Sequence, residues 1–318
     1  QFGWKYGVSS TWIGIGNALI GSLLAWVILG RRTRLMTQHL SSATMPEFFS
    51  KRFDSSSMKL AASAIVFVFL IPYTASLYNG LSRLFESAFH IDYMWCVIIM
   101  SVFTGIYVIA GGYMATAVND FIQGIIMLVG IVIVIAAVLK QNGGFNEALR
   151  TLSQITAETN PGLSGAFTSF FGPEPLALFG VVILTSLGTW GLPQMVGKFY
   201  AIKSESAVSK GTLISTLFAF VVAGGCYFMG GFGRLYADKI AFSESGKPVY
   251  DSIIPAMLDT LPDVIVAIVI MLVLSASMST LSSLVLTSSS TLTLDMIVPI
   301  SEKHGKKLEQ KSQMTLIR

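Results

Sequence analysis

Runs without any charged side chain alternate along the sequence with short polar stretches. Seven runs are long enough to cross a bilayer as a helix, because about 17 to 25 apolar residues span its hydrocarbon core. Asp120 separates the third run from the fourth, and we expect a turn there because AGGYMAT, residues 110–116, breaks a helix. The predicted transmembrane helices are residues 6–30, 60–82, 93–119, 121–139, 175–197, 211–233 and 264–294.

The fifth run is interrupted near its end by LTSLGTWGLPQM, residues 184–195. Glycines permit unwinding there, and Pro193 removes a backbone donor and clashes with the preceding turn. Within a membrane, unwound backbone persists only where protein buries it or where it lines a cavity, as in many secondary transporters. The alternative is an ordinary proline kink without a ligand. If the break is a binding site, the substrate contacts that we expect are Ser186, Thr189, Trp190 and Gln194.

The last run carries many hydroxyl groups in its second half. No charge occurs between Asp263 and Asp295, a helix of roughly 46 Å at about 1.5 Å per residue. Neutral oxygens at membrane depth suit a small hard cation that must bind and then leave. The alternative is that these hydroxyls bond back to carbonyls of their own helix or join helices together. On a helix, one face would carry Ala276, Ser279, Thr280, Ser283 and Thr287.

Composition supports a polytopic, all-α membrane protein. Charged residues make up only 12% of the chain and hydrophobic residues 53%, against about 25% charged in a typical soluble domain. The net charge of +4 therefore indicates membrane topology rather than nucleic-acid binding. Cys96 and Cys226 both lie in apolar runs, without the spacing of a disulfide framework or a paired-cysteine metal site.

The distribution of basic residues predicts the orientation. Of the 21 Lys and Arg residues, 14 fall in residues 31–59, 198–210 and 303–318, so we place these segments in the cytoplasm and the start of the first helix outside. Loops 140–174 and 234–262 then lie outside. No Lys or Arg falls within any predicted span. We expect a cytoplasmic surface helix that opens at Pro46 and an outer surface helix near residues 251–260.

Asp120 and Gln123 share one helical face at spacing i, i+3. A carboxylate at a helix start is stabilised by the helix dipole, so Asp120 could be a simple cap. An ionisable group at the membrane edge of a transporter is equally a functional candidate.

Several ordered motifs resemble the sodium/solute symporter family, which includes the proline, pantothenate, monocarboxylate, sialic acid and sodium/galactose transporters. The stretch SASMSTLSSLVLTSSSTLTLDM, residues 275–296, is similar to a core helix of that family. The sequence departs from the family at Val118 and Asn119, where a Trp-Thr pair is usual. Further matches are Thr44 to Phe48 with Arg52 and Phe53, Gly111 and Gly112 with Ala115, Asp120 and Gln123, and residues 78–93 and 191–204.

The resemblance implies a LeuT-type bundle of two inverted five-helix repeats. Residues 1–318 would form a single membrane domain, and core helix one and the last core helices would belong to other parts of a longer chain. Residues 6–139 would be core helices two to five, residues 175–294 core helices six to eight, and residues 295–318 a cytoplasmic segment. The resemblance also implies sodium as the coupling ion and a bacterial-type plasma membrane as the location.

Two sodium sites follow from the family pattern. The first would use the carbonyl of Ala276 with the hydroxyls of Ser279 and Thr280. The second would use Ser279, Ser282, Ser283 and Asp120.

The substrate stays open at this point. A sugar-binding member has a Glu before the Trp of its second core helix, where this chain has Thr11 before Trp12, so we favour a small amino acid or organic acid and assign Thr11 to the substrate site. A different class is a transporter-like sensor domain of a histidine kinase. We do not expect an enzyme, because His-Glu-x-x-His, Gly-x-Ser-x-Gly and P-loop motifs are absent from the sequence. The expected partners are a small solute, sodium and the lipid bilayer, with no nucleic acid.

Overall fold

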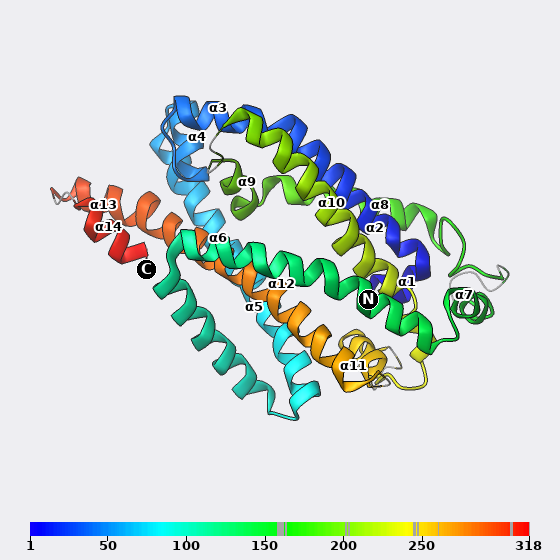
Figure 1. Ribbon diagram of the computed structural model, residues 1–318. Coiled ribbons are helices and arrows are strands. Elements are labelled where there is room, and N and C mark those ends of the chain that lie inside the picture. Colours follow the sequence, from blue (N-terminus) through cyan, green and yellow to red (C-terminus); the bar gives the residue numbers. More distant parts are fainter. Residues whose placement is uncertain are drawn as a thin grey trace.

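The protein is an all-helical bundle in a computed structural model (Figure 1). Residues 1–157, 162, 164–200, 202, 204–243, 246, 248–259, 261–305 and 308–317 are described, with the side chains of residues 87–88, 111–116 and 205 excepted.

The first span is a continuous stack of short helical segments. Its middle is π-helical in η2 and η3, where the chain is wound more loosely than an α-helix. The segments are α1 (Phe2–Tyr6), η1 (Gly7–Ser10), α2 (Thr11–Gly16), η2 (Asn17–Leu24), η3 (Trp26–Gly30) and α3 (Arg31–His39).

The remaining elements follow in chain order. They are α4 (Met45–Phe53), α5 (Ser56–Phe89), α6 (Tyr93–Gln141), α7 (Phe145–Ser153), α8 (Pro175–Gly188), η4 (Thr189–Gly191), α9 (Pro193–Tyr200), α10 (Glu205–Gly230), η5 (Gly233–Tyr236), η6 (Tyr250–Ser252), α11 (Ile253–Leu258), α12 (Asp263–Ser290), η7 (Thr291–Ile297), α13 (Val298–Lys303) and α14 (Gln310–Ile317).

The predicted spans are confirmed. Among the described residues, six helices are long and apolar enough to cross a membrane, and a seventh span results if the bent pair Pro175–Gly191 and Pro193–Tyr200 counts as one. That pair is bent by 50° at the predicted interruption. The predicted turn before Asp120 is wrong, because α6 stays helical throughout. The helix nevertheless changes direction sharply between its two halves, which still separates the third and fourth spans (Figure 1).

Helix packing in the bundle relies on apolar and very small side chains. Met127 and Ile131 of α6 pack against Leu272 of α12 in one buried cluster. On the other side of the bundle, α2 lies directly on α10, since a Cβ on Gly14 would come within 2.5 Å of the Gly224 Cα. Only glycines permit this approach, which fixes the first span against α10.

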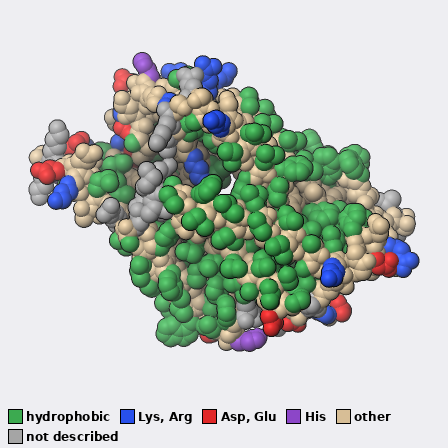
Figure 2. All heavy atoms as spheres, viewed as in Figure 1, with side chains coloured by type: hydrophobic (Ala, Val, Ile, Leu, Met, Phe, Trp, Pro, Cys, Tyr) green, Lys and Arg blue, Asp and Glu red, His purple; other side chains and the backbone are tan. Residues whose placement is uncertain are grey.

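The outer surface of the bundle is apolar, as a lipid-facing surface must be. Phe69, Phe121, Leu176 and Leu184 are all more than two-thirds exposed. Figure 2 shows hydrophobic side chains across the middle of one face and charged side chains gathered at its margins. This arrangement is typical of a multi-pass membrane protein.

At the end that we predict to be cytoplasmic, α4 begins where the sequence predicted it. The Thr44 hydroxyl accepts a hydrogen bond from the Glu47 N–H at 3.2 Å and so caps the helix. Burial by itself raises the pKa of Glu47, but hydrogen bonds from the Ala43 N–H and the Lys51 ammonium outweigh it and hold that pKa below its ordinary value.

At the opposite end, Arg234 of η5 ties the start of the first span to the loop before α8. Its Nε donates to the Trp4 carbonyl at 2.6 Å, and its guanidinium lies 4.7 Å from the Trp4 ring centre and 4.0 Å from that of Phe167. The predicted helix near residues 251–260 is α11, but it is not a surface helix, because Ile253, Met257 and neighbouring side chains are buried against α5, α6 and α12.

Candidate functional site

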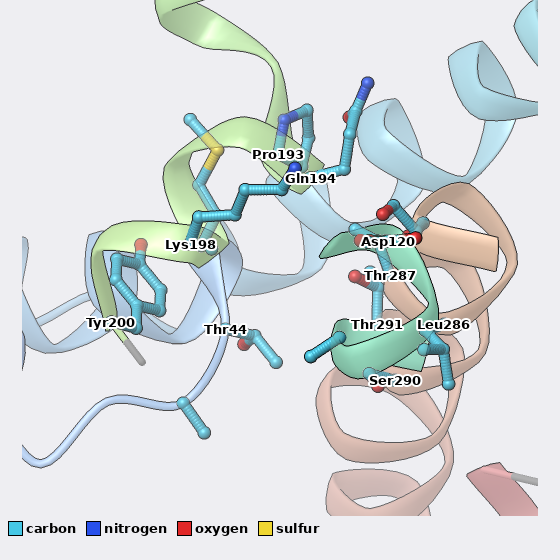
Figure 3. A pocket seen from close by; sticks show the side chains of 15 residues that line it. Thr44, Asp120, Pro193, Gln194, Lys198, Tyr200, Leu286, Thr287, Ser290 and Thr291 are labelled. Carbon is cyan, nitrogen blue, oxygen red and sulfur yellow. The ribbon is translucent and has the colours of Figure 1, made fainter. Parts of the chain in front are cut away.

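A cavity of about 440 Å³ lies between α6, α9 and α12 and the chain that leads into α4 (Figure 3). It lies at the predicted cytoplasmic end, because Thr44 and the C-terminal part of α12 both line it. The described lining residues are Ala43, Thr44, Met45, Ala117, Asp120, Pro193, Gln194, Gly197, Lys198, Tyr200, Ser283, Leu286, Thr287, Ser290 and Thr291.

Asp120 of α6 supplies the carboxylate of this cavity. Its Oδ1 is buried and has no hydrogen-bond partner in the described part of the chain. The Ser279 hydroxyl of α12 hydrogen-bonds the same side chain. A buried, unpaired carboxylate oxygen is costly unless a cation or a donor occupies the space in front of it.

The hydroxyls of α12 bond back to their own helix. Thr280 Oγ1 donates to the Ala276 carbonyl at 2.9 Å, and the hydroxyls of Ser282 and Ser283 donate to the Ser279 carbonyl at 3.0 and 3.1 Å. A hydroxyl that gives its proton to a carbonyl keeps its lone pairs on the outer side, where a cation can use them. Ser283 lines the cavity, whereas Ser282 is completely buried among side chains. Ser283 therefore shares the cavity with Asp120, and Ser279 hydrogen-bonds the Asp120 side chain. Ala276, Thr280 and Ser282 are not among the described residues that line the cavity.

Three of the four predicted substrate residues at the break, Ser186, Thr189 and Trp190, face the first span instead of the large cavity. Trp190 Nε1 donates to the Ile20 carbonyl at 2.9 Å, and Thr189 Oγ1 donates to the Ser186 carbonyl at 2.8 Å. Ser186 Oγ donates to Asn17 Oδ1 at 3.1 Å. Thr189 Oγ1 also contacts the Gly21 carbonyl at 3.3 Å, so all three side chains bond to the π-helical segment η2 and their polar atoms have protein partners.

Gln194 and Thr11 occupy different places again. Gln194 is buried, lines the large cavity with Asp120, and has an Oε1 without a hydrogen-bond partner among the described residues. Thr11 is not among the described residues that line the large cavity, and its hydroxyl donates to the Val8 carbonyl at 2.7 Å. The five predicted substrate residues therefore do not form one cluster.

Two further polar groups of the cavity were missed by the sequence analysis. The prediction that no Lys or Arg lies within a span is wrong, because α9 continues to Tyr200 and brings Lys198 into the broken span. Figure 3 shows Lys198 reaching from α9 in the direction of Asp120. The Tyr200 hydroxyl is also buried without a hydrogen-bond partner in the described structure.

A buried ion pair lies next to the cavity. Asp295 of η7 has a completely buried side chain, and its Oδ1 accepts from Thr44 Oγ1 at 2.8 Å and from Lys59 Nζ at 3.3 Å. Lys59 also donates to the Leu294 carbonyl at 3.3 Å. The start of α5 and the lead into α4 are thereby attached to the end of the long helix that carries the hydroxyls.

Comparisons with known proteins agree with this architecture. The model of the family described as "Sodium:solute symporter family" matches residues 2–318. Among curated relatives, the osmoregulated proline transporter OpuE of Bacillus subtilis (strain 168) is 28% identical over 91% of this chain and 57% of its own length. The sodium/proline symporter of Escherichia coli (strain K12) is 27% identical over 95% and 60%, and that of Staphylococcus aureus is 30% identical over 96% and 58%.

A solved structure with a similar fold is the substrate-bound, outward-open state of a Na+-coupled sialic acid symporter. It matches with a TM-score of 0.72 and 21% identity, over 99% of this chain and 70% of that chain. The fold is therefore part of a LeuT-type helical bundle in a multi-pass protein of the bacterial plasma membrane. The chain spans 57 to 60% of the length of these three curated relatives. It belongs to the sodium:solute symporter family.

Proposed function

We propose that this chain forms the central part of a sodium-coupled symporter for a small amino acid, with proline as the first candidate. The observation that carries the proposal is the buried, unpartnered Oδ1 of Asp120 beside the hydroxyl-bearing helix α12. The names of the curated relatives, which are proline transporters and sodium/proline symporters, support both the ion and the substrate class. They also give no reason to keep the sensor domain or an enzyme as a function.

Two sodium sites would share α12. In the first, the Ala276 carbonyl and the hydroxyls of Ser279 and Thr280 would supply neutral oxygens. In the second, Ser279, Ser282 and Ser283 would act with the Asp120 carboxylate. Neutral oxygens hold an alkali ion weakly enough for release, and one carboxylate adds the attraction that brings the ion out of water.

For the substrate, Gln194 is the best placed of the predicted contacts. Its unpartnered Oε1 can accept a hydrogen bond from the secondary ammonium of proline or the primary ammonium of another amino acid. Trp190, Thr189 and Ser186 would act less directly, by holding the broken helix against η2. Thr11 has no assigned role in substrate binding, because its hydroxyl bonds to the Val8 carbonyl within the first span.

Uptake of radiolabelled proline into proteoliposomes of the full-length protein tests the function. We expect accumulation that depends on an inward sodium gradient and that fails with a potassium or choline gradient. Ser283→Ala is expected to weaken the apparent sodium affinity about tenfold, a loss of about 1.4 kcal/mol at each binding event. The matched control is Ser101→Ala, because Ser101 makes the same backbone bond, to the Val97 carbonyl at 2.7 Å, on an exposed face of α6. Uptake that proceeds equally without sodium would refute the proposal.

A further inference from the structure

The large cavity contains one positive and one negative side chain among its described lining residues. Lys198 comes from α9, the second half of the broken helix, and Asp120 comes from α6. Figure 3 shows the Lys198 side chain extended into the cavity in the direction of Asp120. The charge of Lys198 acts on the Asp120 carboxylate across this space.

Neither Lys198 nor Asp120 forms an ion pair within the described part of the chain. Among the described residues, Lys198 takes part in no ion pair within 4.0 Å, although its side chain is exposed to the cavity. Asp120 Oδ1 likewise has no hydrogen-bond partner within the described part of the chain. The carboxylate thus has room in front of it for one cation, and two are available: the ammonium of Lys198 and an ion from solution.

We propose that Lys198 is a tethered cation that competes with sodium for Asp120. The inference rests on the proposed function, and it adds a positioning residue to the ion site. When sodium occupies the space beside Asp120, like-charge repulsion displaces the ammonium. When sodium leaves, the ammonium moves in and neutralises the carboxylate, whose buried Oδ1 would otherwise have no partner among the described residues.

This competition links the ion to the broken helix. Lys198 follows Pro193 by five positions on α9, so a displaced ammonium changes the forces on the helix that also carries Gln194. Linkage requires the effect to be reciprocal: whatever holds Lys198 away from Asp120 must strengthen sodium binding by the same factor. A substrate that orders α9 with Lys198 displaced would therefore bind together with sodium.

The test measures binding of radioactive sodium to the purified full-length protein without substrate, with choline chloride keeping the ionic strength constant. Lys198→Met keeps the side-chain length but removes the charge, and we expect about tenfold tighter sodium binding. Lys198→Arg keeps a cation in place and is expected to bind sodium as the unaltered protein does. Lys210→Met on α10 is the matched control, because Lys210 is exposed and does not line the cavity.

A second comparison places the effect at Asp120. In an Asp120→Asn background, the Lys198→Met substitution should no longer change the affinity of the sodium binding that remains. Unchanged or weaker sodium binding by Lys198→Met would overturn the inference while leaving the proposed function intact. Unchanged sodium binding combined with weaker proline binding would also overturn it and would assign Lys198 to the substrate carboxylate. Absence of sodium binding in the unaltered protein would overturn both proposals.

Discussion

Removing the ammonium of Lys59 is expected to destabilise the protein far more than neutralising its partner Asp295. The two charges lie 3.3 Å apart, but their surroundings differ: the Asp295 side chain is 0% exposed and that of Lys59 is 21% exposed. Asp295 Oδ2 is already without a hydrogen-bond partner among the described residues. Lys59→Met would leave the carboxylate with Thr44 alone, and removal of one member of a buried pair typically costs about 3–5 kcal/mol.

Asp295→Asn is expected to destabilise the protein less than Lys59→Met, for two structural reasons. An amide oxygen can still accept the 2.8 Å hydrogen bond from Thr44. Lys59 is partly exposed and keeps its bond to the Leu294 carbonyl, so its charge does not become buried and unpaired. The expected loss is about 1–2 kcal/mol, the range for one hydrogen bond made by a charged group.

The decisive measurement is a cycle of three variants. We expect Lys59→Met combined with Asp295→Asn to be more stable than Lys59→Met alone, because the second change removes the stranded charge. Thermal unfolding of the purified protein in one detergent gives the order of stability without requiring reversibility. Lys51→Met is the control, since its pair with Glu47 is partly exposed and is worth less than about 1 kcal/mol. A double variant that unfolds at or below the temperature of Lys59→Met would refute the reasoning.

Three further predictions concern other parts of the bundle. Arg234→Ala is expected to cost about 2–3 kcal/mol and Arg234→Lys less, because an ammonium keeps the charge but cannot stack flat on Trp4; equal melting temperatures for both variants would contradict this. Gly14→Val should separate α2 from α10 at Gly224 and cost at least about 2 kcal/mol, which size-exclusion chromatography would reveal as loss of a monodisperse peak. The Glu47 carboxylate, whose pKa is held below its ordinary value of 4.5, contributes stability that is present above pH 4.5 and disappears as the pH falls through the lowered value. Glu47→Gln is therefore expected to reduce the free energy of unfolding that is lost on acidification, by less than about 1 kcal/mol. Melting temperatures measured across this pH range test it, and an unchanged acid dependence would show that other carboxylates cause it.

The spans and the broken helix could be predicted from the sequence because their causes are local. A membrane excludes charges over a fixed length, and a proline with nearby glycines disrupts a helix wherever it occurs. The same holds for the Thr44 cap, which depends on residues three positions apart. The turn before Asp120 failed because glycine weakens a helix without ending it, and the two halves of α6 change direction while remaining helical.

The charged residues of the site escaped prediction for a different reason. Lys59, Lys198 and Asp295 each lie immediately beyond an apolar run, since such runs end at the first charge. In the structure, the helices or the broken span continue past that point and include all three residues. Whether a charge at such a position reaches water or a partner depends on remote elements, and the sequence pattern of one helix does not contain that information.

The hydroxyls of α12 show why side-chain pattern alone could not separate packing from ion binding. The bonds of Thr280 to Ala276 and of Ser283 to Ser279 are those expected of hydroxyls without a ligand. The same bonds orient the oxygen lone pairs away from the helix axis, which an ion requires. The observation that favours ion binding comes from a remote residue: Asp120 lines the same cavity as Ser283, and its Oδ1 has no hydrogen-bond partner among the described residues.

Two acidic groups at this end of the protein, Asp120 and Asp295, face bases from the opposite half of the chain. Asp120 in the first half faces Lys198 in the second, and Asp295 in the second half pairs with Lys59 in the first. The Lys59–Asp295 ion pair is formed, and the Asp295 side chain is completely buried. Lys198 and Asp120, in contrast, line a cavity without forming an ion pair within the described part of the chain. In the proposed competition, a cation that enters beside Asp120 would displace Lys198 without disturbing the Lys59–Asp295 pair. The two halves of the chain would then stay attached at that pair while α9 is released from Asp120. This asymmetry would allow ion binding to move the broken helix without separating the halves of the bundle.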